Sequence, residues 1–202
     1  MFRWLDGDNI YDAPLTDPAE LAHAAVKLGR FVAALRKVDA SGGPPSWRGG
    51  PLTDDDEEDD VRAAIRDLGA DGTLDGDVAT AAWEEALRLP QWDGDPVWLH
   101  GDLLPGNLLA RGGRLTAVID FGGLGIGDPA ADVLAAWAVF TPETRTLFRE
   151  AADVDDATWA RGRGWALCFG LVAEHYYRVT NPVLAAVAHR TVAEALAEHG
   201  AG

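Results

Sequence analysis

The chain contains one cysteine, Cys168, among 202 residues, and this scarcity excludes two common ways of stabilising a fold. A single thiol forms no intrachain disulfide and no cysteine zinc cluster. Long apolar runs are missing as well, since no stretch approaches the roughly 20 residues of a membrane-spanning helix. Residues 1–8 are too polar for a signal peptide. We therefore expect a cytoplasmic protein that has no membrane partner.

Basic residues are also scarce, because 17 lysines and arginines stand against 33 aspartates and glutamates. The formal net charge of −16 repels nucleic acid and anionic membranes, so neither is an expected partner. A net charge of this size commonly keeps a protein soluble. The alternative interpretation is that the negative charge attracts a cationic small molecule as partner. The acidic run Asp54–Asp60 likewise predicts a solvated loop that enters a helix N-terminus, with recruitment of cations as the alternative.

Apolar residues recur at helical spacing through most of the chain. Asp17 and Pro18 indicate a helix start, and Glu20 is placed to complete a capping box. The predicted helices span residues 17–38, 57–69, 76–89, 128–140, 143–152, 156–179 and 182–198. A short buried strand is predicted at 96–99 and a β-hairpin at 108–119, whose turn contains two glycines. The expected fold is mostly α with a small β-hairpin (α+β), folded as one unit.

Three oxygen-bearing side chains are predicted to converge at the open end of this hairpin. Asp102 and Asn107 share one tight loop, and Asp120 follows the second strand. Because a hairpin brings its ends together, Asp120 should return beside Asn107. A carboxylate orients an acceptor hydroxyl and accepts its proton, and carboxylate and amide oxygens suit Mg²⁺. The pattern therefore predicts metal-assisted phosphoryl transfer.

The motif His100-Gly-Asp102 with Asn107, followed by Asp120-Phe-Gly122, resembles the catalytic and metal-binding loops of the aminoglycoside phosphotransferase family. That family is related in fold to protein kinases, whose signature has the same Asp-to-Asn spacing and a D-F-G. The segments Gly127–Asp132 and Arg3–Gly7 extend the resemblance. It covers essentially the whole chain, as the C-terminal lobe of a protein-kinase-like phosphotransferase.

By this resemblance, Asp102 is the catalytic base, and Asn107 and Asp120 bind Mg²⁺. His100 and Asp132 brace the catalytic loop. The implied reaction moves the γ-phosphate of ATP to a hydroxyl of a small molecule, either an aminoglycoside-like compound or another hydroxylated amine. The resemblance also makes three residues of a late helix candidates for substrate binding, although aromatics at helical spacing are more often core. These residues are Glu174, Tyr176 and Tyr177.

The chain departs from the family pattern in two ways. Leu104 stands where the family often has histidine, and a leucine side chain cannot donate to the transferred phosphate. No glycine-rich loop with a phosphate-pairing lysine precedes residue 98, so we expect the N-terminal β lobe to be absent. Residues 1–8 then form a hinge-like entry segment, and residues 9–202 form the C-terminal lobe as a single domain.

A chain without the N-terminal lobe is expected to be inactive by itself, because half of the nucleotide site is missing. The alternative is a non-catalytic remnant or a small-molecule-binding module of the same fold. A metal-dependent hydrolase is disfavoured, because the other histidines lack a metal-ligand spacing.

Overall fold

The computed structural model describes residues 5–199, without the side chains of Asp55 and Asp56. Arg3 and Trp4 of the expected entry segment lie outside the described residues. From Leu5 the chain runs into β1 (Asp8–Asn9), which pairs with a later strand. The boundary after residue 8, between a hinge-like segment and the lobe, stays a prediction.

Eight α-helices account for most of the described residues, and they lie close to the predicted positions. They are α1 (Pro18–Leu35), α2 (Asp55–Ala70), α3 (Gly76–Leu87), α4 (Ala130–Val133), α5 (Ala135–Val139), α6 (Pro142–Ala152), α7 (Asp156–Tyr177) and α8 (Pro182–His199). The prediction of one continuous helix over 128–140 is wrong, because α4 and α5 are separate. A bond from Trp137 N–H to the Leu134 carbonyl, at 3.1 Å, tightens the backbone where they meet.

The start of α1 confirms part of the predicted cap. Asp17 Oδ1 accepts a bond from Ala19 N–H at 2.8 Å, which satisfies one of the free donors of the first turn. The side chain of Glu20 does not complete a capping box, because its Oε1 accepts from Arg114 Nε at 3.1 Å instead. This bond ties the first turn of α1 to the β-hairpin.

The strands form two small antiparallel sheets. They are β1, β2 (Val97–Leu99), β3 (Leu108–Arg111), β4 (Arg114–Val118) and β5 (Gly125–Gly127). The predicted hairpin is confirmed as β3–β4, with positive φ angles of 58° at Gly112 and 80° at Gly113 in its turn. β1 adds to the free edge of β3, and β5 pairs with β2. The fold is therefore α+β and mostly helical.

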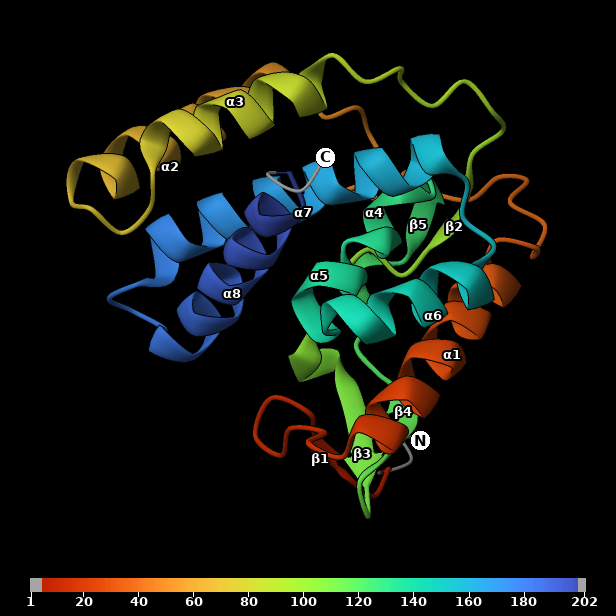
Figure 1. Cartoon of the computed structure of the whole chain (residues 1–202). Helices are drawn as coiled ribbons and strands as arrows, with labels where there is room; N and C mark the ends of the chain where they lie inside the picture. Colours follow the sequence, from red (N-terminus) through yellow and green to blue (C-terminus); the bar gives the residue numbers. More distant parts are fainter. Residues whose placement is uncertain (1–4, 200–202) are drawn as a thin grey trace.

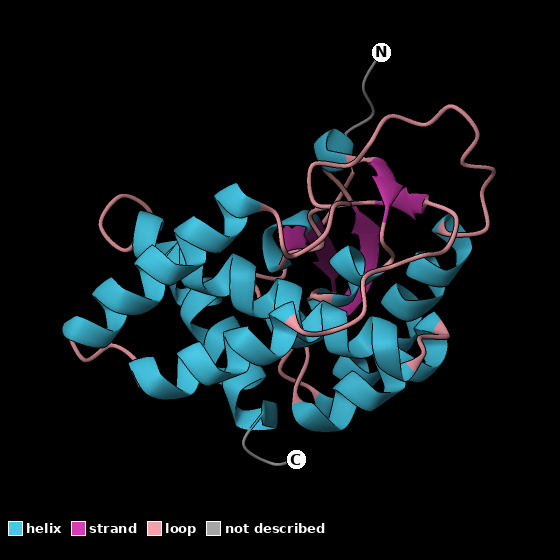
Figure 2. Cartoon of the chain, turned by 90° about the horizontal axis from the view of Figure 1, so that it is seen from above, coloured by secondary structure: helices cyan, strands magenta, loops and turns pink. Residues whose placement is uncertain are grey.

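The helices are arranged around the strands in two groups (Figure 1). α1 packs along α6 beside the hairpin, whereas α2 and α3 form a helical hairpin that lies across α7. α7 also packs along α8. Seen from above, the strands gather on one side of the molecule and the helices fill the rest (Figure 2). None of the described helices is long and apolar enough to cross a membrane.

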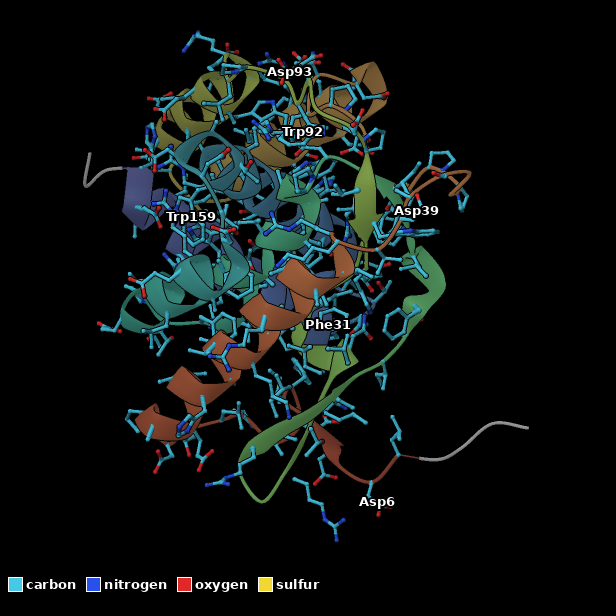
Figure 3. The ribbon with its side chains drawn as sticks, turned by 90° about the vertical axis from the view of Figure 1, so that its right-hand side faces the viewer. Asp6, Phe31, Asp39, Trp92, Asp93 and Trp159 are labelled. Carbon is cyan, nitrogen blue, oxygen red and sulfur yellow. The ribbon has the colours of Figure 1, made fainter. Side chains whose placement is uncertain are left out.

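The hydrophobic core supports the segment between β2 and β3. The largest fully buried side chains of the core are Trp83, Trp137, Phe140 and Phe148. Phe31 of α1, near the centre of Figure 3, packs edge-on against the buried ring of His100, with 6.4 Å between the ring centroids. α1 therefore backs the loop in which the predicted catalytic residues lie.

Candidate active site

The backbone of the loop after β2 is anchored by one buried carboxylate. Asp132 of α4 is 2% exposed, and its two oxygens accept bonds from His100 N–H and Gly101 N–H, both at 2.8 Å. Burial raises the pKa of Asp132, and the two N–H donors counteract that rise. Gly101 has a φ of 78°, and a Cβ there would lie 2.7 Å from the Gly123 carbonyl oxygen. The turn therefore requires glycine at this position.

His100 is fully buried and links the two ends of the site. Its Nδ1 accepts a bond from Asp102 N–H at 3.2 Å, and its Nε2 lies 3.0 Å from the Ile119 carbonyl oxygen. This pattern places the ring proton on Nε2. The ring also packs against Phe121, with 4.8 Å between centroids. The contacts are those of a brace between the Asp102 loop and the end of β4.

Asp102 and Asn107 are held in direct contact. The amide Nδ2 of Asn107 donates to the backbone carbonyl and to Oδ2 of Asp102, both at 2.8 Å. A short 3-10 turn at Pro105–Asn107 makes this possible, because it brings the chain back over a separation of five residues. The nitrogen of the amide therefore faces Asp102, and the amide oxygen, Oδ1, points away from it.

The hairpin returns Asp120 to the neighbourhood of Asn107, as the topology predicts. Ile119 N–H donates to the Asn107 carbonyl at 2.9 Å, and Asp120 is the next residue. Asp120 adopts the left-handed conformation, with φ 60° and ψ 68°, and its Oδ1 accepts from Gly122 N–H at 3.3 Å. The side chain is exposed. A non-glycine residue in this conformation is uncommon and points to a constrained local geometry.

The donors at this end of the hairpin fit the chemistry of Mg²⁺. The Asn107 amide oxygen and the Asp120 carboxylate are hard oxygen ligands, and Mg²⁺ commonly takes one or two such ligands beside water and phosphate. Among the described residues, no group of three His, Cys, Asp or Glu side chains is placed to share a metal. The predicted ligands, Asn107 and Asp120, are one amide and one carboxylate, and therefore differ from such a three-residue cluster. The assignment of Asn107 and Asp120 as ligands stays a prediction.

A cavity of about 600 Å³ opens beside Asp102, and we call it the Asp102 cavity. Its walls come from the loop before α2, from α2, from α7, from α8 and from the Asp102 loop. The polar part of the lining is Arg48, Glu57, Asp60 and Asp102, and the aromatic part is Trp47, Trp165, Phe169, Tyr176 and Tyr177. The lining therefore combines carboxylates with rings, a combination that suits an organic cation.

Arg48 and Glu57 are site residues for which the sequence offered no signal. Arg48 Nη1 lies 3.1 Å from Asp102 Oδ1, and the two residues are 54 positions apart in the chain. Glu57 accepts a bond from Cys168 Sγ at 3.2 Å. Burial raises the pKa of Glu57, while the Cys168 bond and the charge of Arg48 act in the opposite direction. Burial, together with the adjacent Glu57, raises the pKa of the Cys168 thiol well above its usual value.

The three candidate substrate residues of α7 do not lie together. Tyr176 and Tyr177 line the Asp102 cavity, and Tyr176 is 70% exposed. Glu174 is buried and outside the lining, where its Oε1 shares a bond of 2.8 Å with His189 Nδ1 of α8. Successive positions on a helix diverge by about 100°, so Glu174 and its two neighbours point in different directions. A role in substrate binding stays a prediction for all three.

Residues 1–165 match the sequence model described as the phosphotransferase enzyme family. No curated protein matches the chain.

Solved structures share the fold at low sequence identity. The gentamicin complex of APH(2″)-IIa aligns with a TM-score of 0.55 and 19% identity, over 96% of this chain and 68% of its own. A macrolide 2′-phosphotransferase type I aligns with a TM-score of 0.57 and 20% identity, over 88% of this chain and 60% of its own. The GDP complex of aminoglycoside 2′-phosphotransferase-IIIa aligns with a TM-score of 0.65 and 16% identity, over 98% of this chain and 70% of its own. The chain thus spans 60 to 70% of the length of these proteins.

Proposed function

Because this chain belongs to the phosphotransferase enzyme family, we propose that, together with an N-terminal nucleotide-binding lobe, it transfers the γ-phosphate of ATP to a hydroxyl group of a small molecule. The observation that carries the proposal is the contact between Asn107 and Asp102, where Asp102 lines a cavity of about 600 Å³. The family describes the reaction class. The nucleotide, the acceptor and the residue roles are our proposals for the whole protein.

Asp102 is the proposed base. Its side chain is 29% exposed and lines the cavity, so an acceptor hydroxyl there reaches a carboxylate oxygen. Each oxygen of Asp102 has one protein donor, Arg48 or Asn107, and a carboxylate oxygen accepts two bonds. The hydroxyl oxygen attacks the γ-phosphorus as its proton passes to Asp102. The bond to the β–γ bridging oxygen breaks, and that oxygen leaves with the electron pair on ADP.

The neighbouring residues support this reaction by position. Asn107 Oδ1 and the Asp120 carboxylate would hold Mg²⁺, which supplies positive charge to the phosphates when bound. Asp132 and His100 keep the loop backbone in place by the bonds described above. Preorganised groups of this kind lower the barrier because they need no rearrangement during the reaction.

The proposed acceptor is a hydroxylated amine. Support comes from the carboxylates and rings of the Asp102 cavity, which attract and stack on organic cations. Structural relatives point the same way, since one is described with gentamicin and another as a ternary complex with ADP and hygromycin B. A further relative is described with GDP, so both ATP and GTP belong in the assay. A panel of hydroxylated amines, scored by nucleotide consumption, identifies the acceptor.

The variant Asp102→Asn tests the proposal. It preserves the shape of the side chain but removes the proton acceptor, so kcat should fall by roughly 10²–10⁴-fold. The Kd for the nucleotide, measured by titration calorimetry, should change less than about twofold, because Asp102 is not a proposed nucleotide ligand.

The matched control is Asp93→Asn, an exposed aspartate in the loop after α3, visible at the edge of Figure 3. It should leave kcat unchanged. Near wild-type turnover in Asp102→Asn would rule out Asp102 as the base.

A further inference from the structure

Arg48 is the only cationic residue among the described side chains that line the Asp102 cavity. It faces the carboxylates of Glu57, Asp60 and Asp102 in a chain whose net charge is −16. A single cation in such an acidic cavity has no evident use in attracting an amine, since it repels one. Its position therefore calls for a different explanation.

The guanidinium is firmly held. Its side chain is 11% exposed, and Nη1 donates both to the Gly101 carbonyl and to Asp102 Oδ1, each at 3.1 Å. Its Cζ lies 4.1 Å from the Trp47 ring centroid and 5.2 Å from that of Phe169. Both hydrogen bonds use one of three nitrogens, and a guanidinium offers five N–H donors in a rigid fork.

The loop has an anchor that is independent of Arg48. Asp132 already fixes the N–H groups of His100 and Gly101 from the buried side. Arg48 contacts the loop from the side of the cavity, on the carboxylate that is the proposed base. A group placed there lies next to any phosphoryl group that approaches a hydroxyl held by Asp102.

Phosphoryl transfer places negative charge at this point. The transition state spreads charge over three phosphoryl oxygens, and fixed cations there are the main protein contribution to the rate. The other side chain of the Asp102 loop that lines the cavity is Leu104, which is aliphatic and donates nothing. Arginine binds such oxygens well, because its fork matches phosphate geometry.

We propose that Arg48 binds the phosphoryl group during its transfer, as a catalytic residue supplied by the loop between α1 and α2. This inference rests on the proposed function. The hydroxyl oxygen forms the new bond to phosphorus, ADP leaves with the electron pair, and Asp102 takes the proton. Arg48 donates hydrogen bonds to the phosphoryl oxygens throughout and exchanges no proton.

The test combines turnover with binding of a transition-state mimic. Arg48→Met keeps a long side chain against Trp47 and Phe169 but removes the charge. We expect kcat to fall by roughly 10²–10³-fold. In titrations with Mg²⁺, ADP affinity should stay within about twofold, while the extra affinity gained on adding aluminium fluoride should fall by at least about tenfold. Unchanged kcat and unchanged gain with aluminium fluoride would overturn the proposal.

A second variant separates a charge effect from a structural one. Leu104 lines the same cavity as Arg48 and Asp102, so a longer side chain at position 104 extends into that cavity. Adding Leu104→Lys to Arg48→Met places a cation in the same cavity and should restore at least about tenfold in kcat. A brace that merely supports the loop would not be replaced in this way. The control is Arg163→Met, which removes an arginine of α7 paired with Glu85, outside the cavity lining, and should change neither readout.

The two proposals fail in different ways. If the wild-type protein transfers phosphate and Arg48→Met does so equally well, the role of Arg48 is wrong and the proposed function stands. If the wild-type protein transfers no phosphate to the acceptor panel, the proposed function fails. The aluminium fluoride titration then tests the role of Arg48 separately. If the extra ADP affinity with aluminium fluoride depends on Arg48, the result supports a phosphoryl site at Arg48. If that extra affinity does not depend on Arg48, or is not observed, the role of Arg48 is overturned.

Discussion

Glu57 is placed where its charge is costly to the fold. It lines the Asp102 cavity and accepts a bond from Cys168, and burial is the largest influence on its pKa. Because that pKa is raised in the folded state, the folded protein binds a proton that the unfolded chain has released above pH 4.5. The contribution of Glu57 to stability therefore falls as the pH rises through this window.

Glu57→Gln tests this pH dependence. Glutamine keeps an acceptor for Cys168 but carries no titratable proton, so the variant should gain stability relative to wild type as the pH rises above 4.5. Urea unfolding at a series of pH values measures the difference. Cys168→Ala provides the comparison, because loss of the bond from Cys168 raises the Glu57 pKa further and should widen the window. A wild-type pH profile in Glu57→Gln contradicts the assignment.

Contacts between residues close together in the chain can be predicted from the sequence, whereas contacts between residues far apart in the chain cannot. Asp102 and Asn107 are five residues apart on a loop with a proline and a glycine, so their proximity follows from the turn. Arg48 belongs to a Gly/Pro-rich loop with no periodic pattern, and only the tertiary fold brings it to Asp102. Glu57 lies in an acidic run that resembles a solvated surface, whereas one face of α2 turns it toward the cavity.

The pairing of α1 with α6 depends on a glycine. A Cβ at Gly29 would lie 2.6 Å from the Phe148 carbonyl oxygen and 2.8 Å from Ala151 Cβ. The two backbones are therefore in direct contact, and any side chain there would push them apart.

Gly29→Ala should lower the free energy of unfolding by about 1–3 kcal/mol, as overpacking of a rigid contact does. Urea denaturation at neutral pH measures the change. Gly76→Ala is the matched control, since a Cβ at Gly76 of α3 meets nothing nearer than 3.7 Å. That control should stabilise the protein by about 0.4–1 kcal/mol, because alanine reduces the entropy of the unfolded chain. Equal effects at both glycines would contradict the packing argument.

The long elements and the short strand β2 were predictable from the sequence, whereas β1 and β5 were not. The amphipathic patterns of α1 and α2 and the glycine turn of the β3–β4 hairpin identify these elements directly. β1 and β5 lack an apolar run such as Val97–Leu99 of β2, and they form where β3 and β2 offer unpaired edges. The separation of α4 from α5 lies within a fully buried alanine-rich segment, and no glycine or proline marks the break.

The whole molecule is a strongly acidic body around an acidic cavity. With a net charge of −16, its field attracts cations over a distance set by the ionic strength. The screening length falls from about 30 Å at 0.01 M to about 8 Å at 0.15 M. Encounter with a charged acceptor therefore weakens as salt is added.

We expect the KM for a cationic hydroxylated acceptor to rise by at least about threefold between these ionic strengths. Initial rates at saturating ATP, in buffers that differ only in sodium chloride, measure the effect. A neutral hydroxylated acceptor provides the control and should show a nearly constant KM. The same salt dependence for both acceptors would mean that the acidic surface plays no part in acceptor binding.

The helical hairpin of α2 and α3 joins the rest of the molecule mainly across α7, yet it contributes Glu57 and Asp60 to the cavity. The groups proposed for the chemistry, Asp102, Asn107 and Asp120, come from a separate stretch of chain. On the proposed function, part of the acceptor site and the reactive groups would belong to different segments of the chain. Exchange of residues 55–87 for the equivalent segment of a homologue would redirect which alcohol is modified while the bond-making centre stays intact.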